Sequence, residues 1–283
     1  MHELVFLKLG GSVITDKTRS EVLDEAILGQ LAQVIAATLH ANPALRMLIG
    51  HGGGSFGHHW ANLYQTHHGV RDERGWEGVV KVADAMGRLN RDVVRRLMAA
   101  GVPAMSVQPS ASAITAHGRL ERLSTEPLAA LLHAGVVPVV YGDVAVDREQ
   151  GAAIISTEAI FAFLTPLLQP RRIVLVGEQA VYTADPRRDP RAERIPVIDE
   201  TNIEQVLGQT TGSHAVDVTG GMATKVATMW HLVSSFEGLE VQLVGTDPAE
   251  VGEVLRAGSR QIGTLICRQA ATSPGRDPAG TKE

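Results

Sequence analysis

Residues 46–58 read Arg-Met-Leu-Ile-Gly-His-Gly-Gly-Gly-Ser-Phe-Gly-His, and the rest of the chain can be understood from this stretch. The apolar run at 46–49 is typical of a buried strand. The three glycines at 52–54 allow a sharp turn and let a ligand approach the backbone N–H groups. A segment that can be helical follows, and the N-terminus of a helix attracts anions. The stretch therefore predicts a strand, an anion-binding loop and a helix, with a tight turn that binds nothing as the simpler alternative.

The composition is that of an ordinary globular protein. The chain has 283 residues, of which 44% are hydrophobic and 20% are charged. A net charge of −5 and an aromatic content of 4% argue against a nucleic-acid surface. The single cysteine, Cys267, rules out an intramolecular disulfide and cannot by itself form a cysteine metal site. We see no signal peptide and no run near the ~18 apolar residues of a membrane span, so we expect a cytoplasmic protein without membrane contact.

Strands and helices alternate along the chain. Apolar runs predict strands at 4–9, 46–49, 104–107, 136–141, 173–176, 241–244 and 264–267. Helical spacing or flanking signals predict helices at 21–40, 77–100, 125–133, 156–168, 223–235 and 248–257. Because the strands are continuously apolar, we predict an α/β protein whose mainly parallel central sheet is covered by helices on both faces.

The connections between these elements are of several kinds. Residues 114–122 and 143–155 are expected to form hairpins, and the His-, Gly- and Arg-rich segment 59–75 is expected to be a mobile connection. The sequence shows no composition break, so one domain covers 1–268, with lobes of about 1–170 and 171–268. Residues 269–283 are expected to be a disordered tail.

Glycines, lysines and a carboxylate fall where predicted strands end. In an open α/β sheet, ligands bind at the carboxyl ends of the strands. The candidate segments there are Lys8-Leu9-Gly10-Gly11-Ser12, Gly52 to His58, Gly142-Asp143 and Tyr182 to Asp185, joined by Lys225 behind Gly220-Gly221. Backbone N–H groups and lysines can position two phosphate-bearing partners and neutralise the charge that spreads during transfer. This inventory predicts phosphoryl transfer.

Each candidate also has a structural alternative. Lys8 lies in an apolar strand, where an unpaired lysine is costly to bury, so a functional role is favoured. Lys17 could instead be a solvated loop lysine. Lys225 could be exposed on a helix face, although its place after Gly220-Gly221 favours a functional role. The remaining alternatives are a cap or packing role for His58, a turn cap for Asp143, core packing for Val82, Ala83 and Met86, and surface positions rather than a zinc site for His59, His67 and His68.

A dinucleotide-binding motif is a further possibility. Gly52-x-Gly54-x-x-Gly57 follows a strand, and Asp72 and Glu73 lie near the distance expected of a ribose-binding acid. That acid should end a second strand, whereas Asp72 lies in a polar segment. A Walker A motif is absent. An NAD(P)-dependent oxidoreductase is therefore the alternative from another functional class.

Four motifs, in this order, resemble those of the amino-acid kinase superfamily: Lys8-Leu-Gly-Gly-Ser12, His51-Gly-Gly-Gly54, Val181-Tyr-Thr-Ala-Asp-Pro186 and Gly220-Gly-Met-x-x-Lys225. The resemblance covers nearly all of the chain to about residue 268. It implies a three-layer α/β/α sandwich, with an N-terminal lobe for the phosphate acceptor and a C-terminal lobe for ATP and Mg²⁺. Within the superfamily, Gly54-Ser-Phe-Gly-His58 and Thr15-Asp16-Lys17 look like the isopentenyl phosphate kinases, which convert isopentenyl phosphate and ATP into isopentenyl diphosphate.

The resemblance also implies roles for individual residues. Gly53 and His58 would hold the acceptor phosphate, with Gly142 and Asp143 beside it. Lys8 and Lys17 would neutralise the transferring group, and Asp143 would orient the lysines. The nucleotide would be bound by Lys8, Gly10, Gly11, Ser12, Gly54, Tyr182, Asp185, Gly221 and Lys225. The helix that carries Val82, Ala83 and Met86 would wall a pocket for the apolar tail, together with Ile154 and Ile155.

The family implies a homodimer that acts on a small-molecule substrate, and no residue is assigned as a metal ligand. A related kinase for a small phosphate or phosphonate, such as a fosfomycin kinase, remains an alternative within phosphoryl transfer. The segment Val176-Gly-Glu-Gln-Ala180 lacks the acid-rich Asp-x-Asp-Gly of many members, so contacts to the nucleotide base are not assigned.

Overall fold

The computed structural model describes residues 3–16, 18–177, 180–184, 186, 189–210 and 221–269. Its main feature is an eight-stranded sheet in which β1 is central. Across the sheet the strands are β12 (Val197–Ile198), β14 (Thr264–Ile266), β13 (Glu240–Val244), β9 (Arg172–Val176), β1 (Leu4–Leu9), β2 (Arg46–His51), β6 (Val137–Tyr141) and β3 (Ala104–Ser106). All neighbouring strands are parallel except β13 and β14. The predicted, mainly parallel sheet is confirmed.

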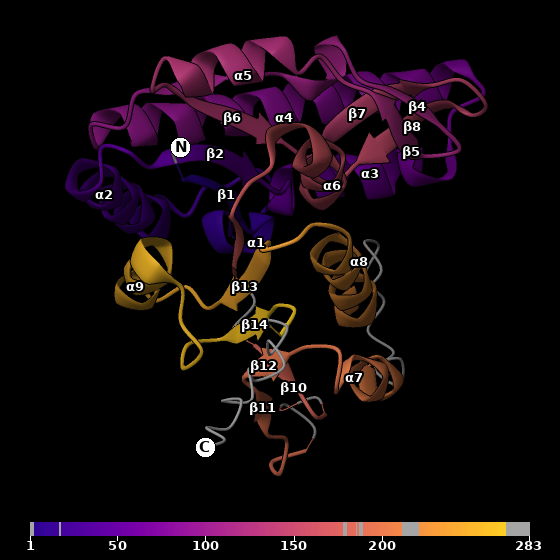
Figure 1. The fold of residues 1–283 in the computed structure, drawn as a ribbon. Coiled ribbons are helices and arrows are strands. Elements are labelled where there is room, and N and C mark those ends of the chain that lie inside the picture. The colour runs from indigo at the N-terminus through magenta and orange to yellow at the C-terminus, as the bar shows by residue number, and fades with distance from the viewer. Residues whose placement is uncertain are drawn as a thin grey trace, which may run out of the picture.

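Helices cover both faces of this sheet, as Figure 1 shows. Alternate residues of a strand point to opposite faces, and β1 divides in this way: Val5 and Leu7 join one buried core, whereas Phe6 joins the other. The first core also contains residues of α2 (Glu25–Ala41), α3 (Gly54–Tyr64), α4 (Glu73–Ala99) and α9 (Pro248–Ala257). The second contains residues of α5 (Glu126–His133), α6 (Thr157–Leu168), α7 (Ile203–Thr210) and α8 (Gly221–Ser235). The architecture is a three-layer α/β/α sandwich.

Two smaller sheets lie outside these layers. The hairpins β4 (Ile114–Ala116) with β5 (Arg119–Arg122) and β7 (Asp143–Asp147) with β8 (Gly151–Ile155) form where the sequence predicts them. Parallel pairing of β4 with β7 joins them into one four-stranded sheet, which the sequence does not predict. The remaining short elements are α1 (Gly11–Ile14), the 3₁₀ helices η1 (Thr66–His68) and η2 (Pro109–Ala111), and the pair β10 (Val181–Tyr182) and β11 (Arg194–Ile195).

The segment predicted to be a mobile connection is mostly helical. Helix α3 continues through His59 to Tyr64, and α4 begins at Glu73 rather than at residue 77. The carboxylate of Asp72 caps α4 by accepting from Gly75 N at 2.8 Å. Gly78 is buried, and a Cβ there would lie 2.8 Å from Cγ of Tyr64, the last residue of α3, so the absence of a side chain lets the two helices approach. The polar, histidine-rich composition concealed this packing.

The central strands place the predicted loops at one edge. The chain leaves β1 for β2 on one side, and β9 later pairs with β1 on the other. Such a reversal of strand order opens a crevice at the carboxyl ends of the strands. In Figure 1 the indigo-to-magenta elements through α6 lie above the orange-to-yellow elements such as α8 and α9. We propose that the two lobes of the domain meet near residue 170. The predicted tail lies outside the described residues from residue 270 onward.

No helix in the described stretches combines the length and the apolar character that crossing a bilayer requires.

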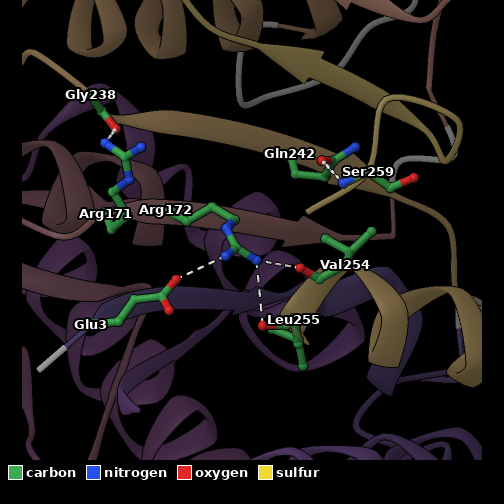
Figure 2. A network of polar contacts seen from close by, with 8 residues as sticks. All are labelled: Glu3, Arg171, Arg172, Gly238, Gln242, Val254, Leu255 and Ser259. Atoms are coloured by element: carbon green, nitrogen blue, oxygen red, sulfur yellow. Dashed lines mark hydrogen bonds and ion pairs between the residues drawn. The ribbon is translucent and has the colours of Figure 1, made fainter. Parts of the chain in front are cut away.

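Arg172 lies at the other end of the strands, where β9 begins, and connects three segments (Figure 2). Its side chain is only 7% exposed. The guanidinium donates to Val254 O and Leu255 O in the last turn of α9, and to Glu3 Oε1 at 2.8 Å. A cation at the C-terminus of a helix also complements the helix dipole. Arg172 therefore fastens α9 and the first strand to β9.

We expect Arg172→Met to lower the free energy of unfolding by about 2–4 kcal/mol, because Val254 O, Leu255 O and the Glu3 carboxylate all lose the hydrogen bonds that this buried guanidinium donates. Urea denaturation measures this loss. Arg171→Met is the matched control, since the guanidinium of Arg171 donates to Gly238 O at an exposed site (Figure 2), and this variant should cost less than about 1 kcal/mol. Equal losses in the two variants would contradict the assignment.

Candidate functional site

A cavity of about 550 Å³ opens at the carboxyl edge of the central strands. It is bordered by the ends of β1, β2 and β9 and by helices α3, α4, α6 and α8. The predicted site residues that line it are Lys8, Gly10, Gly11, Ser12, Gly53, Gly54, His58, Val82, Met86, Gly142, Asp143 and Lys225. Segments far apart in the sequence are thus brought to one place.

The other predicted residues are placed differently or not described. Ala83 packs against the first core and does not line the cavity. Tyr182 pairs with Arg194 across β10 and β11 and is also absent from the lining. Gly221 begins α8, one turn before Lys225. Lys17 and Asp185 lie outside the described residues, so their predicted roles stay predictions.

Two glycine loops touch backbone to backbone. A Cβ on Gly11 would lie 2.8 Å from Gly52 C, 2.9 Å from Gly53 N and closer still to Gly54 N. Gly54 has a φ of +49°, which an L side chain rarely adopts. Thr15 joins the two loops, because its hydroxyl donates to Gly11 O at 2.8 Å and accepts from Ser55 N at 3.0 Å. These glycines are required for the loops to meet.

A third glycine contact joins the loops that follow the neighbouring strands β1 and β9. Gly10 N donates to Val176 O at 2.9 Å. Gly177 has a φ of +118°, and a Cβ there would lie 2.5 Å from Val13 Cγ2. The crevice floor is therefore bare backbone, which suits the close approach of a phosphate chain.

The second glycine loop presents amide donors. Gly52 N donates to Leu9 O, while Gly53 O accepts from Phe56 N and Gly57 N at the start of α3. Within the part of the chain that the structure describes, Gly53 N and Gly54 N have no protein acceptor. Both residues line the cavity at the positive end of the helix. The loop can therefore donate hydrogen bonds to an anion.

Lys8 is held by a carboxylate that the sequence did not single out. Lys8 Nζ lies 2.6 Å from Glu158 Oε1, and the two side chains are 14% and 19% exposed. Burial alone would raise the pKa of Glu158, but the charges of Lys8 and Lys225 and the hydrogen bond from Lys8 lower it. Glu158 is therefore ionised at neutral pH and keeps a cation beside the glycine loops.

Glu158 stands in the first turn of α6, behind the N-cap Ser156, whose hydroxyl accepts from Ala159 N at 3.0 Å. A carboxylate at a helix start beyond a buried strand is the signal that could have identified it. Asp143, expected to orient the lysines, instead accepts from Ser110 N at 3.1 Å and Val144 N at 2.8 Å. Burial raises the pKa of Asp143. The carboxylate that contacts Lys8 is that of Glu158, not that of Asp143.

The other end of the cavity is apolar. Ala61, Val82, Met86, Ile154 and Ile155 line it, coming from α3, α4 and β8. Met86 packs against α3 because Gly57 has no side chain. A Cβ on Gly57 would lie 2.9 Å from Met86 Sδ. His58 is exposed and lies on α3, one turn from Ala61. The imidazole of His58 is thus part of the same lining as the glycine loop and the apolar residues.

The dinucleotide interpretation does not fit this geometry. Asp72 is the N-cap of α4 and does not end a strand, so it is not placed to bind a ribose at the sheet edge. Gly57 lies inside α3 and serves the approach of Met86.

The lining fits the phosphates of a nucleotide better than it fits a protein-held metal. Lys225, Thr224 and Thr228 of α8 face the cavity together with Lys8 and Glu158. Among the described residues, no group of three or more His, Cys, Asp or Glu side chains could hold a metal ion. Mg²⁺ commonly binds through substrate phosphates with few protein ligands, so its presence would not require such a group.

Comparison with known proteins gives consistent results. The model of the amino acid kinase family matches residues 3–244. The isopentenyl phosphate kinase of Methanothermobacter thermautotrophicus is 34% identical over 274 residues, covering 93% of this chain and 98% of that protein. That of Haloferax volcanii is 39% identical over 261 residues, covering 88% and 98%.

A solved isopentenyl phosphate kinase structure superimposes with a TM-score of 0.79 at 30% identity, covering 93% of this chain and all of the other. Family match, relatives and fold agree over most of the chain's length. The chain belongs to the amino acid kinase family.

Proposed function

We propose that this protein transfers the γ-phosphoryl group of ATP to isopentenyl phosphate, giving isopentenyl diphosphate and ADP. One observation carries the proposal: a single cavity has amide donors and lysines at one end and an apolar wall at the other. A monophosphate with a short hydrocarbon tail matches both ends. The relatives that are 34% and 39% identical carry the same enzyme name.

The polar end accounts for the transfer step. Gly53 N and His58 hold the acceptor phosphate, Gly54 N contacts ATP, and an oxygen of the acceptor phosphate attacks the γ-phosphorus as ADP leaves. Lys8, fixed by Glu158, neutralises charge on the transferring group. Because the salt bridge is largely removed from water, Lys8 needs little reorganisation at the moment of transfer. Lys17 contributes a second cation in this proposal.

The nucleotide lies along the crevice between β1 and β9. Gly10, Gly11 and Ser12 accommodate its phosphates, and Lys225 lies beside them on α8. The proposal also includes the nucleotide contacts that the sequence predicts for Tyr182, Asp185 and Gly221. Mg²⁺ bound to the phosphates would supply further charge neutralisation. The proposal keeps the cytoplasmic location and the homodimer expected from the sequence; light scattering tests the latter.

The apolar end distinguishes the acceptor from its alternative. Met86, Ile154 and Val82 provide hydrocarbon contacts that a small phosphonate such as fosfomycin does not use. An isoprenoid tail buries these side chains and gains the corresponding hydrophobic free energy. A fosfomycin kinase is therefore the less favoured function.

ADP release in the presence of ATP and Mg²⁺ tests the function. The acceptor panel comprises isopentenyl phosphate, dimethylallyl phosphate, fosfomycin, UMP, glutamate and carbamate. Turnover confined to the two isoprenoid phosphates is the expected result. Turnover with fosfomycin, or with none of these acceptors, would contradict the proposal.

His58→Ala should raise the KM for isopentenyl phosphate and lower kcat, by about tenfold in kcat/KM, since it removes one donor to the acceptor phosphate. Steady-state kinetics with the acceptor varied measures the change. His59→Ala is the control: His59 is the next residue and contacts Trp60 edge-on instead of lining the cavity. Unchanged kinetics in His58→Ala would remove this histidine from the site.

A further inference from the structure

A chain of polar side chains leads from the exposed Ser106 through buried residues to the second glycine loop, and it has no role in the reaction proposed above. His51, the last residue of β2, is 0% exposed, and Asn90 of α4 is 2% exposed. Asn90 Nδ2 lies 3.1 Å from His51 Nε2, and Ser106 Oγ donates to Asn90 Oδ1 at 2.5 Å. His51 Nδ1 lies 3.0 Å from Gly52 O. Three elements are linked in this way to the first peptide of the loop.

The chain fixes one form of the His51 ring. Gly52 O can only accept, so Nδ1 carries the proton. Nε2 then accepts from the Asn90 amide, whose oxygen is taken by the Ser106 hydroxyl. Burial lowers the pKa of His51 to about 4, so the ring is neutral at physiological pH. Stacking on Tyr141, with ring centroids 5.4 Å apart, fixes its plane.

The ring's position determines where the next amide points. In a planar trans peptide, the carbonyl and the following N–H point in opposite directions. Holding Gly52 O against the buried ring therefore turns Gly53 N away from it. Gly53 lines the cavity and His51 does not. The peptide would otherwise be free to rotate, because glycine restricts it little.

We propose that His51, held by Asn90 and Ser106, is a positioning residue that orients the Gly52–Gly53 peptide so that Gly53 N donates to the acceptor phosphate. This rests on the proposed function only for the identity of the acceptor. The ligand chemistry it requires is a phosphate group.

Two substitutions separate positioning from packing. An asparagine amide branches at Cγ, as the imidazole does, so in His51→Asn its Nδ2 can replace Nδ1 as the donor to Gly52 O. A glutamine amide extends one bond farther, so His51→Gln reaches toward Asn90 but loses that donor. Glutamine is nearer to histidine in volume, so a packing role predicts the opposite ranking of the two variants.

The probe is inorganic phosphate, titrated into full-length protein labelled with ¹⁵N-glycine, with the Gly53 amide assigned through Gly53→Ala. We expect the wild-type Gly53 signal to shift, His51→Asn to weaken phosphate binding less than about threefold, and His51→Gln to weaken it about tenfold or more. Gln242→Leu removes buried hydrogen bonds to Ile262 O and Ser259 N remote from the cavity, and should leave binding unchanged. The proposal is overturned if the Gly53 amide signal does not shift when phosphate is added, or if His51→Gln binds phosphate as tightly as His51→Asn does.

A measurement on the unmodified sequence covers the case in which the variants do not fold. Ring ¹⁵N shifts of His51 should report a protonated Nδ1 and a bare Nε2; the other tautomer, or an imidazolium at neutral pH, overturns the proposal. Failure of the proposed function can be told apart from failure of this inference. If none of the acceptors were turned over, the phosphate titration and the tautomer of His51 would be unaffected.

Discussion

Replacing Lys8 with methionine is expected to lower kcat about 10³-fold while changing the acceptor KM by less than about threefold. Lys8 Nζ is the cation held 2.6 Å from Glu158 at the end of β1. A preorganised charge aimed at the transferring group acts mainly in the transition state, and removing one such donor typically costs about 10²–10³ in kcat. Steady-state kinetics with ATP saturating and isopentenyl phosphate varied gives both constants.

The same variant should also be less stable, because Glu158 is left largely buried without its ion-pair partner. The double variant Lys8→Met with Glu158→Gln removes that unpaired charge. We expect it to recover most of the lost stability and none of the lost kcat, whereas Glu158→Gln alone lowers kcat about tenfold to 10²-fold by freeing Lys8. Recovery of activity together with stability would show that the lysine serves only folding.

Lys81→Met is the matched control. Lys81 lies on α4, exposed and over the ring of Trp60 at 5.6 Å, and it does not line the cavity. It removes the same charge from the same protein, so it should leave kcat and KM within about twofold. A large effect of Lys81→Met would indicate that overall charge, and not the position of Lys8, governs turnover.

Gly11→Ala should lower kcat/KM by at least about 10²-fold and the free energy of unfolding by about 1–3 kcal/mol. The added Cβ would meet Gly52 C and Gly53 N at 2.8 and 2.9 Å, and these are backbone atoms that cannot rotate aside. The two glycine loops must then separate, and both phosphate sites move with them. Activity assays and urea denaturation measure the two losses.

Gly29→Ala is the control for Gly11→Ala. Gly29 lies inside α2, and a Cβ there meets nothing within 4 Å. Alanine is the better helix former, so this variant should be as stable as the wild type or more stable by up to about 1 kcal/mol, with unchanged kinetics. A Gly11→Ala variant with wild-type activity would show that the loops do not need their backbone contact.

The sequence by itself determined the fold class and predicted most of the loops that line the cavity. Continuous apolar runs such as 136–141 predict strands covered on both faces, and the glycine groups after β1 and β2 mark the edge of the sheet at which the cavity opens. The helix at 248–257 was predicted with its observed bounds, since Asp247 and Pro248 are strong start signals. These features are local, so neighbouring residues suffice to specify them.

The tertiary structure alone decided which residues meet. Glu158 lies 150 positions from Lys8, so its place at a helix start could mark it as a candidate but could not show that it pairs with Lys8. Helix α3 reaches into the histidine-rich segment as far as Tyr64, where Gly78 of α4 packs against it, and the His51–Asn90–Ser106 chain requires β2, α4 and β3 to be in place. Such contacts depend on strand order and helix crossing, which are set by burial of the whole core and not by any one segment's pattern.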